Sequence, residues 1–323
     1  MSNLKNSLVI LAILLMAMAC KKESKRQANG LTGINPLAYT DVAFMGSKDT
    51  AVVSTYSGRI IRKIKDQPED QVLANVEDEI YALKYAQSRN ELIAATHQSG
   101  ILILDAETGK VNRELELEKW CVSLFLSEDE NYLMGIDLSG KNRIWDIKND
   151  YLSIEYPDSL PRRYIRCMDN LGVFYLTGAG KVSLWNPSET SFRKEISLPG
   201  RVADVDKNGN VLALSHNEFY LYDSGKDSLR FSLKHPSWPF LQENGDTVSI
   251  PYQMKLLNAR FANNRIYTSG IDRSIREWDA KNGKLLQTWV GHKASVNSFD
   301  ISEDESQIVS VDLKGGIQFR NIK

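Results

Sequence analysis

Short apolar runs separated by turn residues make up most of the chain. Residues 121–146 are an example: CVSLFL, the turn SEDEN, YLMGID, the turn LSGK and NRIWD. Runs of this length, alternating or fully apolar, are typical of β-strands, and no helical period competes with them. The acidic, Ser-Gly and Asn-Gly turns between the runs favour hairpins. The pattern predicts an all-β chain of short antiparallel strands.

One kind of strand recurs at a regular interval, with an end that resembles Ile-Trp-Asp. Its last residues are Lys63, Asp105, Asp146, Asn186, Asp223, Asp279 and Asn321. The spacings are 42, 41, 40, 37, 56 and 42 residues, and the long one contains a proline-rich insertion, HPSWPFLQENGDTVSIPY. Segments 127–146 and 302–321 share one pattern, because both begin with SEDE and continue with apolar runs and an Asp-Leu turn at matching positions. A period near 40 residues predicts seven four-stranded units that stack radially, because one unit cannot bury both of its faces alone.

Residues 268–302 resemble a WD40 repeat. Trp278 and Asp279 supply the Trp-Asp pair, Gly291 and His292 supply the Gly-His pair, and Asp272 lies six residues before the tryptophan. The resemblance implies a seven-bladed β-propeller over residues 31–323, built from four-stranded antiparallel blades. It also implies a hydrogen-bonded network of histidine, serine or threonine, aspartate and tryptophan inside each blade.

The repeats depart from this network. Tyr252 stands near the histidine position of the sixth unit, and Lys314 and Arg320 stand where the last unit should have its acid and indole. We therefore expect no blade with all four residues, and blades held mainly by apolar packing. The last unit has three strands, so residues 31–36 are expected to add the fourth strand and close the ring.

The first thirty residues have a different character. Lys5 precedes an apolar run over residues 8–19 that is too short to span a bilayer, and Cys20 follows Ala19. This resembles a bacterial lipoprotein signal, which implies a signal peptide over 1–19, a lipid on Cys20 and a flexible tether over 20–30. Ala17 stands where the family usually has leucine, so a secretory signal or a retained anchor stays open.

Charge and cysteine content exclude some classes and leave one question open. Forty basic and forty-one acidic residues give no strong positive field, so we expect no nucleic-acid partner. Apart from Cys20, the chain has Cys121 and Cys167, which could form a disulfide in an oxidising compartment or remain two buried thiols.

Motifs for catalysis, metals or cofactors are missing from the sequence. It has no phosphate loop, zinc pair, CxxC or nucleophile elbow, and its four histidines have no ligand spacing. Residues 204–210, DVDKNGN, match the opening of a calcium loop, but Leu212 and Ser215 stand where further ligands would follow. We predict a hairpin turn there, with calcium as the alternative, and no cofactor.

Aromatic residues fall into two groups. Trp145, Trp185 and Trp278 occupy the repeat position, and we expect them in the core. Others lie with basic residues in connections that lead into the first, channel-lining strand of a blade. The candidate partner-binding residues are Trp120, Arg162, Arg163, Trp238, Phe240, Tyr252, Lys255 and Lys293. An aromatic and basic rim suits a binding hot spot, although each residue could instead cap its own blade.

The sequence therefore predicts a monomeric, membrane-anchored and non-catalytic scaffold of the bacterial cell envelope. It would bind another envelope protein or peptide on the channel face. The residue after Cys20 is Lys21 and not the aspartate that marks inner-membrane retention in some bacteria, which favours the outer membrane. Two alternatives remain: a propeller hydrolase or lyase with carboxylates at the channel mouth, and a surface lipoprotein that binds glycans or small ligands.

Overall fold

The computed structural model describes residues 37–236, 238–241, 245–250 and 254–322 of the chain. These residues form 29 β-strands and one three-residue 3-10 helix, Gln87–Arg89. In this part of the chain, no helix has the length and apolar character required to cross a bilayer. The predicted all-β class is confirmed.

The strands form antiparallel blades in chain order, each numbered from its innermost strand outward. Blade 1 is β1 (Tyr39–Met45), β2 (Ser47–Thr55), β3 (Arg59–Ile64) and β4 (Gln71–Asn75). Blade 2 is β5 (Ile80–Ala86), β6 (Glu91–Thr96), β7 (Ile101–Asp105) and β8 (Val111–Leu115). Blade 3 is β9 (Cys121–Leu126), β10 (Tyr132–Asp137), β11 (Asn142–Asp146) and β12 (Leu152–Ile154).

The second half of the ring repeats this plan. Blade 4 is β13 (Tyr164–Met168), β14 (Phe174–Gly178), β15 (Lys181–Trp185) and β16 (Lys194–Ser197). Blade 5 is β17 (Arg201–Val205), β18 (Val211–Ser215), β19 (Glu218–Asp223) and β20 (Ser228–Lys234). Blade 6 is β23 (Leu256–Ala262), β24 (Arg265–Gly270), β25 (Ile275–Asp279) and β26 (Leu285–Trp289). Blade 7 is β27 (Val296–Ile301), β28 (Gln307–Asp312) and β29 (Ile317–Asn321).

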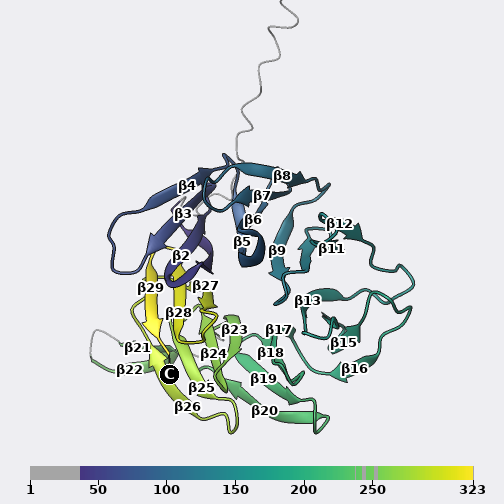
Figure 1. Cartoon of the computed structure of the whole chain (residues 1–323). Coiled ribbons are helices and arrows are strands. Elements are labelled where there is room, and N and C mark those ends of the chain that lie inside the picture. The colour runs from purple at the N-terminus through teal and green to yellow at the C-terminus, as the bar shows by residue number, and fades with distance from the viewer. Residues whose placement is uncertain (1–36, 237, 242–244, 251–253, 323) are drawn as a thin grey trace, which may run out of the picture. The chain divides into compact units, whose positions relative to one another are not determined.

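The inner strands close a ring (Figure 1). Each inner strand contacts the inner strand of the next blade, and β27 contacts β1. The seven-bladed propeller is confirmed. The repeat also located the third strands correctly, since β7, β11, β19, β25 and β29 end at the predicted residues and β3 and β15 end within one residue of them.

Several predictions on the N-terminal part lie outside the described residues. They are the signal peptide over 1–19, the lipidated Cys20 with the tether over 20–30, and the closing strand over 31–36. In the described part of the chain, blade 7 has three strands. The closing strand stays a prediction.

Apolar packing between neighbouring blades forms the core. Trp145 is 6% exposed and Trp185 is 0% exposed, and Trp278 is 5% exposed, so the three tryptophans are buried as predicted. Trp145 of blade 3 shares one cluster with Ile93 of blade 2. The clusters join blades, because each sheet face is covered by the face of the next sheet.

The two cysteines are free thiols in different blades. Cys121 is buried on β9 and Cys167 lies on β13. Burial raises the pKa of the Cys121 thiol to about 12, so this thiol stays protonated and poorly reactive at neutral pH. The structure therefore has two unbridged thiols at these positions.

Blade 6 contains the complete network that we expected to be missing. His235 Nε2 lies 2.7 Å from Thr268 Oγ1, and Trp278 Nε1 donates to the same oxygen at 2.9 Å. His235 Nδ1 lies 3.3 Å from Asp272 Oδ2. The prediction that no blade holds all four residues is wrong. The histidine was missed because the insertion separates it from its own blade by twenty residues of sequence, and Tyr252 is not its substitute.

Blade 7 holds a partial network with a displaced acid. His292 Nε2 lies 2.8 Å from Ser310 Oγ, and His292 Nδ1 lies 3.0 Å from Asp312 Oδ2. Asp312 ends β28, so the carboxylate comes from two residues before the position of Lys314. Arg320 does replace the indole, as the sequence suggested. Hydrogen bonding thus adds to apolar packing in both blades.

The duplicated SEDE segments form the same turn in blades 3 and 7. Ser127 Oγ donates to Asp129 Oδ1 at 2.7 Å in one, and Ser302 Oγ donates to Asp304 Oδ1 at 2.7 Å in the other. The fourth residue of each turn, Glu130 and Glu305, has a positive φ. This left-handed backbone turns the glutamate out of its own hairpin.

Each of these glutamates contacts the neighbouring blade. The Glu130 carboxylate accepts the backbone amide protons of Gln87 and Ser88 in blade 2, at 2.7 and 2.8 Å. Glu305 Oε2 accepts the amide proton of Asn263 in blade 6 at 2.6 Å. The repeated segment therefore builds a bond between blades as well as a turn within one.

The insertion forms an additional hairpin between blades 5 and 6. Its strands are β21 (Trp238–Leu241) and β22 (Thr247–Ile250), paired antiparallel. Both ends of the excursion bond to one turn of blade 5: His235 N donates to Asn217 O at 2.9 Å, and Leu256 N donates to His216 O at 2.7 Å. The hairpin thus leaves and rejoins the ring at one place.

The calcium-like segment is a hairpin turn between β17 and β18, as predicted. Asp206 Oδ1 accepts the amide protons of Asn208 and Asn210 at 2.8 and 2.9 Å. Gly209 has a φ of +75°, which suits glycine at this turn. Asp204 lies on β17 and bonds elsewhere, to Phe261 N at 2.7 Å.

Candidate functional site

The ring has two faces that differ in their connections. On one face, which we call the connection face, the outer strand of each blade connects to the inner strand of the next blade. The turns between the second and third strands of each blade lie on the same face. We call the turn face the one that holds the turns between first and second strands. The predicted partner-binding residues within the described chain precede inner strands, so they belong to the connection face.

Trp120 lies in a cluster of aromatic rings on this face. Its ring centroid is 4.3 Å from that of Tyr81 and 5.2 Å from that of His97. Tyr56 packs edge-on against Tyr81 at 5.9 Å. We call these four residues the aromatic cluster. Tyr81, His97 and Trp120 are half-buried, so the cluster presents ring surface to solvent.

Two acids lie beneath the aromatic cluster. Asp78 Oδ2 accepts the amide protons of Gln98 and Ser99, both at 2.8 Å. Glu79 is 4% exposed, and its Oε2 accepts the Tyr81 hydroxyl proton at 2.6 Å. Burial raises the pKa of Tyr81, and the bond to Glu79 adds to the rise, so the phenol stays a donor. Glu79 Oε1 is buried without a hydrogen-bond partner in the described part of the chain.

The sequence did not single out Glu79, Tyr81 or His97. A signal was present, because Asp78 and Glu79 come directly before an apolar inner strand where a chain rarely buries adjacent acids. His97 lies in the turn between β6 and β7, far from Trp120 in sequence, so only the fold brings the rings together.

The basic candidates differ in their surroundings. The Arg163 guanidinium pairs with Glu195 at 3.2 Å and is held against its own blade, with 11% of its side chain exposed. Arg162 is exposed, stacks over the Tyr164 ring at 5.8 Å and donates to Ser139 O.

Lys255 and Lys293 are both exposed on the connection face. The backbone amide of Lys293 donates to Asp312 Oδ2 at 3.1 Å, which fixes the backbone at this position. The residue itself is exposed. These two lysines lie before β23 and β27, on the part of the ring that follows the insertion.

The remaining candidates lie in the insertion. Trp238 and Phe240 belong to β21, whose backbone pairs with β22. Their side chains, and all of Tyr252, lie outside the described residues. Because the insertion joins β20 to β23, its ends lie on the connection face with Trp120.

The carboxylates of the inner strands bond to neighbouring blades. Asp41 Oδ2 accepts the amide proton of Leu83 at 3.0 Å, and Asp300 Oδ2 accepts that of Phe44 at 2.9 Å. Asp204 makes the matching bond to blade 6. Each acid thereby joins one inner strand to the next.

Arg260 lies between two of these acids. It is 3.6 Å from Asp204 Oδ2 and 3.8 Å from Asp300 Oδ1, and 43% of its side chain is exposed. Burial lowers the pKa of Arg260, but the two carboxylates outweigh burial and raise it. Burial raises the pKa of the Asp204 carboxyl, against the effect of Arg260. The three groups form one charged set on β17, β23 and β27.

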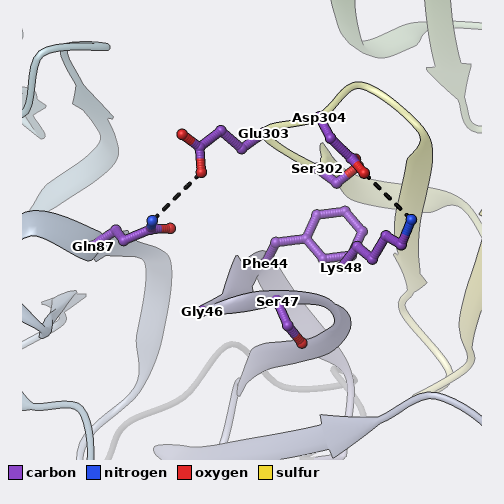
Figure 2. Close-up of a pocket in the computed structure, with 8 residues that line it drawn as sticks. All are labelled: Phe44, Gly46, Ser47, Lys48, Gln87, Ser302, Glu303 and Asp304. Carbon is purple, nitrogen blue, oxygen red and sulfur yellow. Dashed lines mark hydrogen bonds and ion pairs between the residues drawn. The ribbon is translucent and has the colours of Figure 1, made fainter.

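The turn face has a hollow of about 170 Å³ (Figure 2). It is lined by Phe44, Gly46, Ser47, Lys48, Gln87, Ser302, Glu303 and Asp304. Lys48 pairs with Asp304 at 3.3 Å, and Gln87 donates to Glu303 at 3.4 Å, so side chains of three blades bond to one another around it. Its polar groups are therefore already engaged.

Comparisons with known proteins address the fold. No protein-family model matches the sequence. A segment of 92 residues, 28% of this chain, is 30% identical to the human (Homo sapiens) angio-associated migratory cell protein. A segment of 82 residues, 25% of this chain, is 30% identical to the COMPASS component SWD3 of Saccharomyces cerevisiae. These matches span 17% and 23% of the relatives' own lengths.

A solved structure covers most of the chain. The computationally designed protein Ika8 superposes with a TM-score of 0.62 over 90% of this chain and 98% of its own, at 18% identity, which shows the fold alone. Three observations support one fold: the seven blades, the network of His235 with Thr268, and the similarity to the two sequence relatives. The chain is a WD40-like seven-bladed β-propeller. A WD40-like propeller fits a protein-interaction scaffold, because its rigid ring presents two broad faces of loops.

Proposed function

We propose that this WD40-like propeller is a lipid-anchored, non-catalytic and monomeric scaffold of the bacterial cell envelope. It binds another envelope protein or peptide on its connection face. The observation that supports this most is the aromatic cluster, which presents three half-buried rings to solvent on that face. Aromatic side chains fixed in this way are common binding hot spots, because they bury large areas at little entropic cost.

The insertion supports the same face. It adds a hairpin to the connection between blades 5 and 6 and is not one of the seven blades. A loop of this kind is explained more easily by binding than by stability. Its residues Trp238 and Phe240, with Lys255 and Arg162 as a charged rim, are the proposed anchors.

Partner capture tests the proposal. Replacing Trp238 and Phe240 together by alanine should weaken capture from an envelope extract by about 2 kcal/mol or more, the usual size of a hot-spot loss. A matched control replaces Leu152 and Leu229, exposed by 63% and 50% on outer strands, by alanine and should leave capture unchanged. A Trp238 and Phe240 variant that melts normally and captures the same proteins at the same level contradicts this site.

The anchor is tested separately. Cys20→Ser should abolish metabolic lipid labelling and leave an unprocessed or soluble protein. The reason is that Cys20 occupies the position of the lipidated cysteine in the lipoprotein signal that residues 1–20 resemble. Unchanged labelling would show that the lipoprotein interpretation is wrong. Fractionation of the parent protein should place it in the outer membrane.

A further inference from the structure

Glu79 is a buried acid whose carboxylate is only partly hydrogen-bonded. It is 4% exposed, and its Oε1 is buried with no hydrogen-bond partner in the described part of the chain. Its other oxygen, Oε2, bonds to the neutral Tyr81 hydroxyl, although burying a carboxylate is costly unless the charge is paired. His97 Nδ1 is likewise buried without a partner there. The site therefore has a carboxylate oxygen that the described part of the chain leaves without a donor.

The rings around this carboxylate suit a cation. The Tyr81 hydroxyl fixes Glu79 Oε2 at 2.6 Å, and the Tyr81 ring lies 4.3 Å from Trp120. His97 stands edge-on to Trp120, at an interplanar angle of 87°. The negative faces of Trp and Tyr rings attract ammonium and guanidinium groups, and a nearby carboxylate adds to this attraction.

Charge around the cluster points the same way. The connections into β5 and β9 carry five acidic residues and one basic residue, namely Glu77, Asp78, Glu79, Glu116, Glu118 and Lys119. By contrast, exposed cations lie on the connections into β13, β23 and β27. The connection face is therefore acidic beside the aromatic cluster. A basic group of a partner is attracted to the side that holds the aromatic cluster.

We propose that Glu79, Tyr81, His97 and Trp120 bind the cationic side chain of a lysine on the partner protein. This site rests on the proposed scaffold function and specifies its ligand chemistry. The carboxylate neutralises the charge, and the Trp120 and Tyr81 rings cover the alkyl stem of the bound side chain. This cation site is one contact point on the connection face, separate from the proposed anchors Trp238 and Phe240 in the insertion.

The probe is a single side chain. Nα-acetyl-L-lysine methylamide is titrated into the full chain in detergent micelles, labelled with ¹⁵N at the tryptophan indoles. The Trp120 signal is assigned by its loss in Trp120→Phe. A saturable shift with a dissociation constant on the order of 1–10 mM is expected for one side chain. Nα-acetyl-L-norleucine methylamide, which has the alkyl chain without the ammonium, should give no saturable shift.

Two glutamine variants separate the buried acid from general charge. Glu79→Gln keeps an acceptor for the Tyr81 hydroxyl and should weaken the lysine probe by about tenfold or more. Glu77→Gln removes the same formal charge from an exposed neighbour and should change the affinity by less than about twofold. If Glu79→Gln fails to fold, the comparison of the lysine and norleucine probes on the parent protein decides alone.

Several outcomes would overturn the site. They are no saturable shift with the lysine probe, equal binding of norleucine, and full binding by a folded Glu79→Gln. The pull-down separates this result from the scaffold proposal. If the parent captures partners and Glu79→Gln captures them equally, the cation site is wrong and the scaffold stands. If the lysine probe binds but the parent captures no partner, the scaffold proposal fails.

Discussion

Replacing His235 by alanine is the most direct test of how blade 6 is held. The imidazole is 2% exposed and connects Thr268 Oγ1 at 2.7 Å with Asp272 Oδ2 at 3.3 Å. It also packs against the Trp278 ring at 5.8 Å between centroids. Alanine removes both bonds and the contact of Nδ1 with the Arg276 guanidinium. It also opens a gap beside the indole, while Thr268 and Asp272 stay buried.

The magnitude follows from these contacts. Loss of one neutral bond costs about 1 kcal/mol, and loss of one bond to a carboxylate costs about 1.5–3 kcal/mol. Asp272 keeps its bond from Ser274 and its pairing with Arg276, so the lower part of the range applies. We expect His235→Ala to lower the free energy of unfolding by about 3 kcal/mol. At roughly 2 °C per kcal/mol for a domain of this size, the melting temperature should fall by about 6 °C.

The assay is urea and thermal unfolding followed by tryptophan fluorescence. Lys234→Ala is the control, because its side chain is 66% exposed and its pairing with Glu218, at 3.9 Å, is weak; it should stay within about 0.5 kcal/mol of the parent. A double-mutant cycle with Thr268→Val should give a coupling energy of about 1 kcal/mol. A His235→Ala protein that melts within about a degree of the parent, or a coupling near zero, refutes the reasoning.

Further predictions concern the joints between blades and the response to pH. Glu130→Gln should lower the free energy of unfolding by about 1 kcal/mol, because a neutral amide cannot accept from two backbone amides as the carboxylate does. The control Glu128→Gln, at an exposed residue, should cost less than half of that. Equal losses would show that the Glu130 contact does not stabilise the joint between blades. Burial lowers the pKa of His235 and His292, against the opposing effect of their aspartates, so the unfolded chain binds more protons and stability should fall as the pH falls below about 6.5; equal urea midpoints at pH 7.5 and 5.5 would contradict this. Deleting residues 31–36 should lower the melting temperature sharply by exposing the edge of β29, and a change within about a degree would exclude the predicted closing strand.

Strand positions could be predicted from the sequence because they depend on local patterns. Alternating apolar residues and the turns between them recur every 40 residues, and the third strand of each blade ends within one residue of its predicted end. The burial of Trp145, Trp185 and Trp278 followed from their common repeat position. These features depend on neighbours in sequence, which periodicity records.

Long-range contacts could not be predicted in the same way. His235 reaches Asp272 across 37 residues, because the insertion stands between them, so counting back from Trp278 gave Tyr252 instead. Asp312 replaces the acid of blade 7 from a different repeat position, which a fixed spacing hides. The aromatic cluster joins Tyr56, Tyr81 and Trp120 from three consecutive blades, and the stacking of these blades brings the rings together.

The base of the inserted hairpin has a consequence for how this protein can change. Its two ends bond to the adjacent residues His216 and Asn217, and His235 anchors the departing end in blade 6. Because both ends are fixed at one turn of blade 5, we expect a longer, shorter or altered hairpin to leave the ring unchanged. New binding specificities are therefore best grafted between residues 236 and 255.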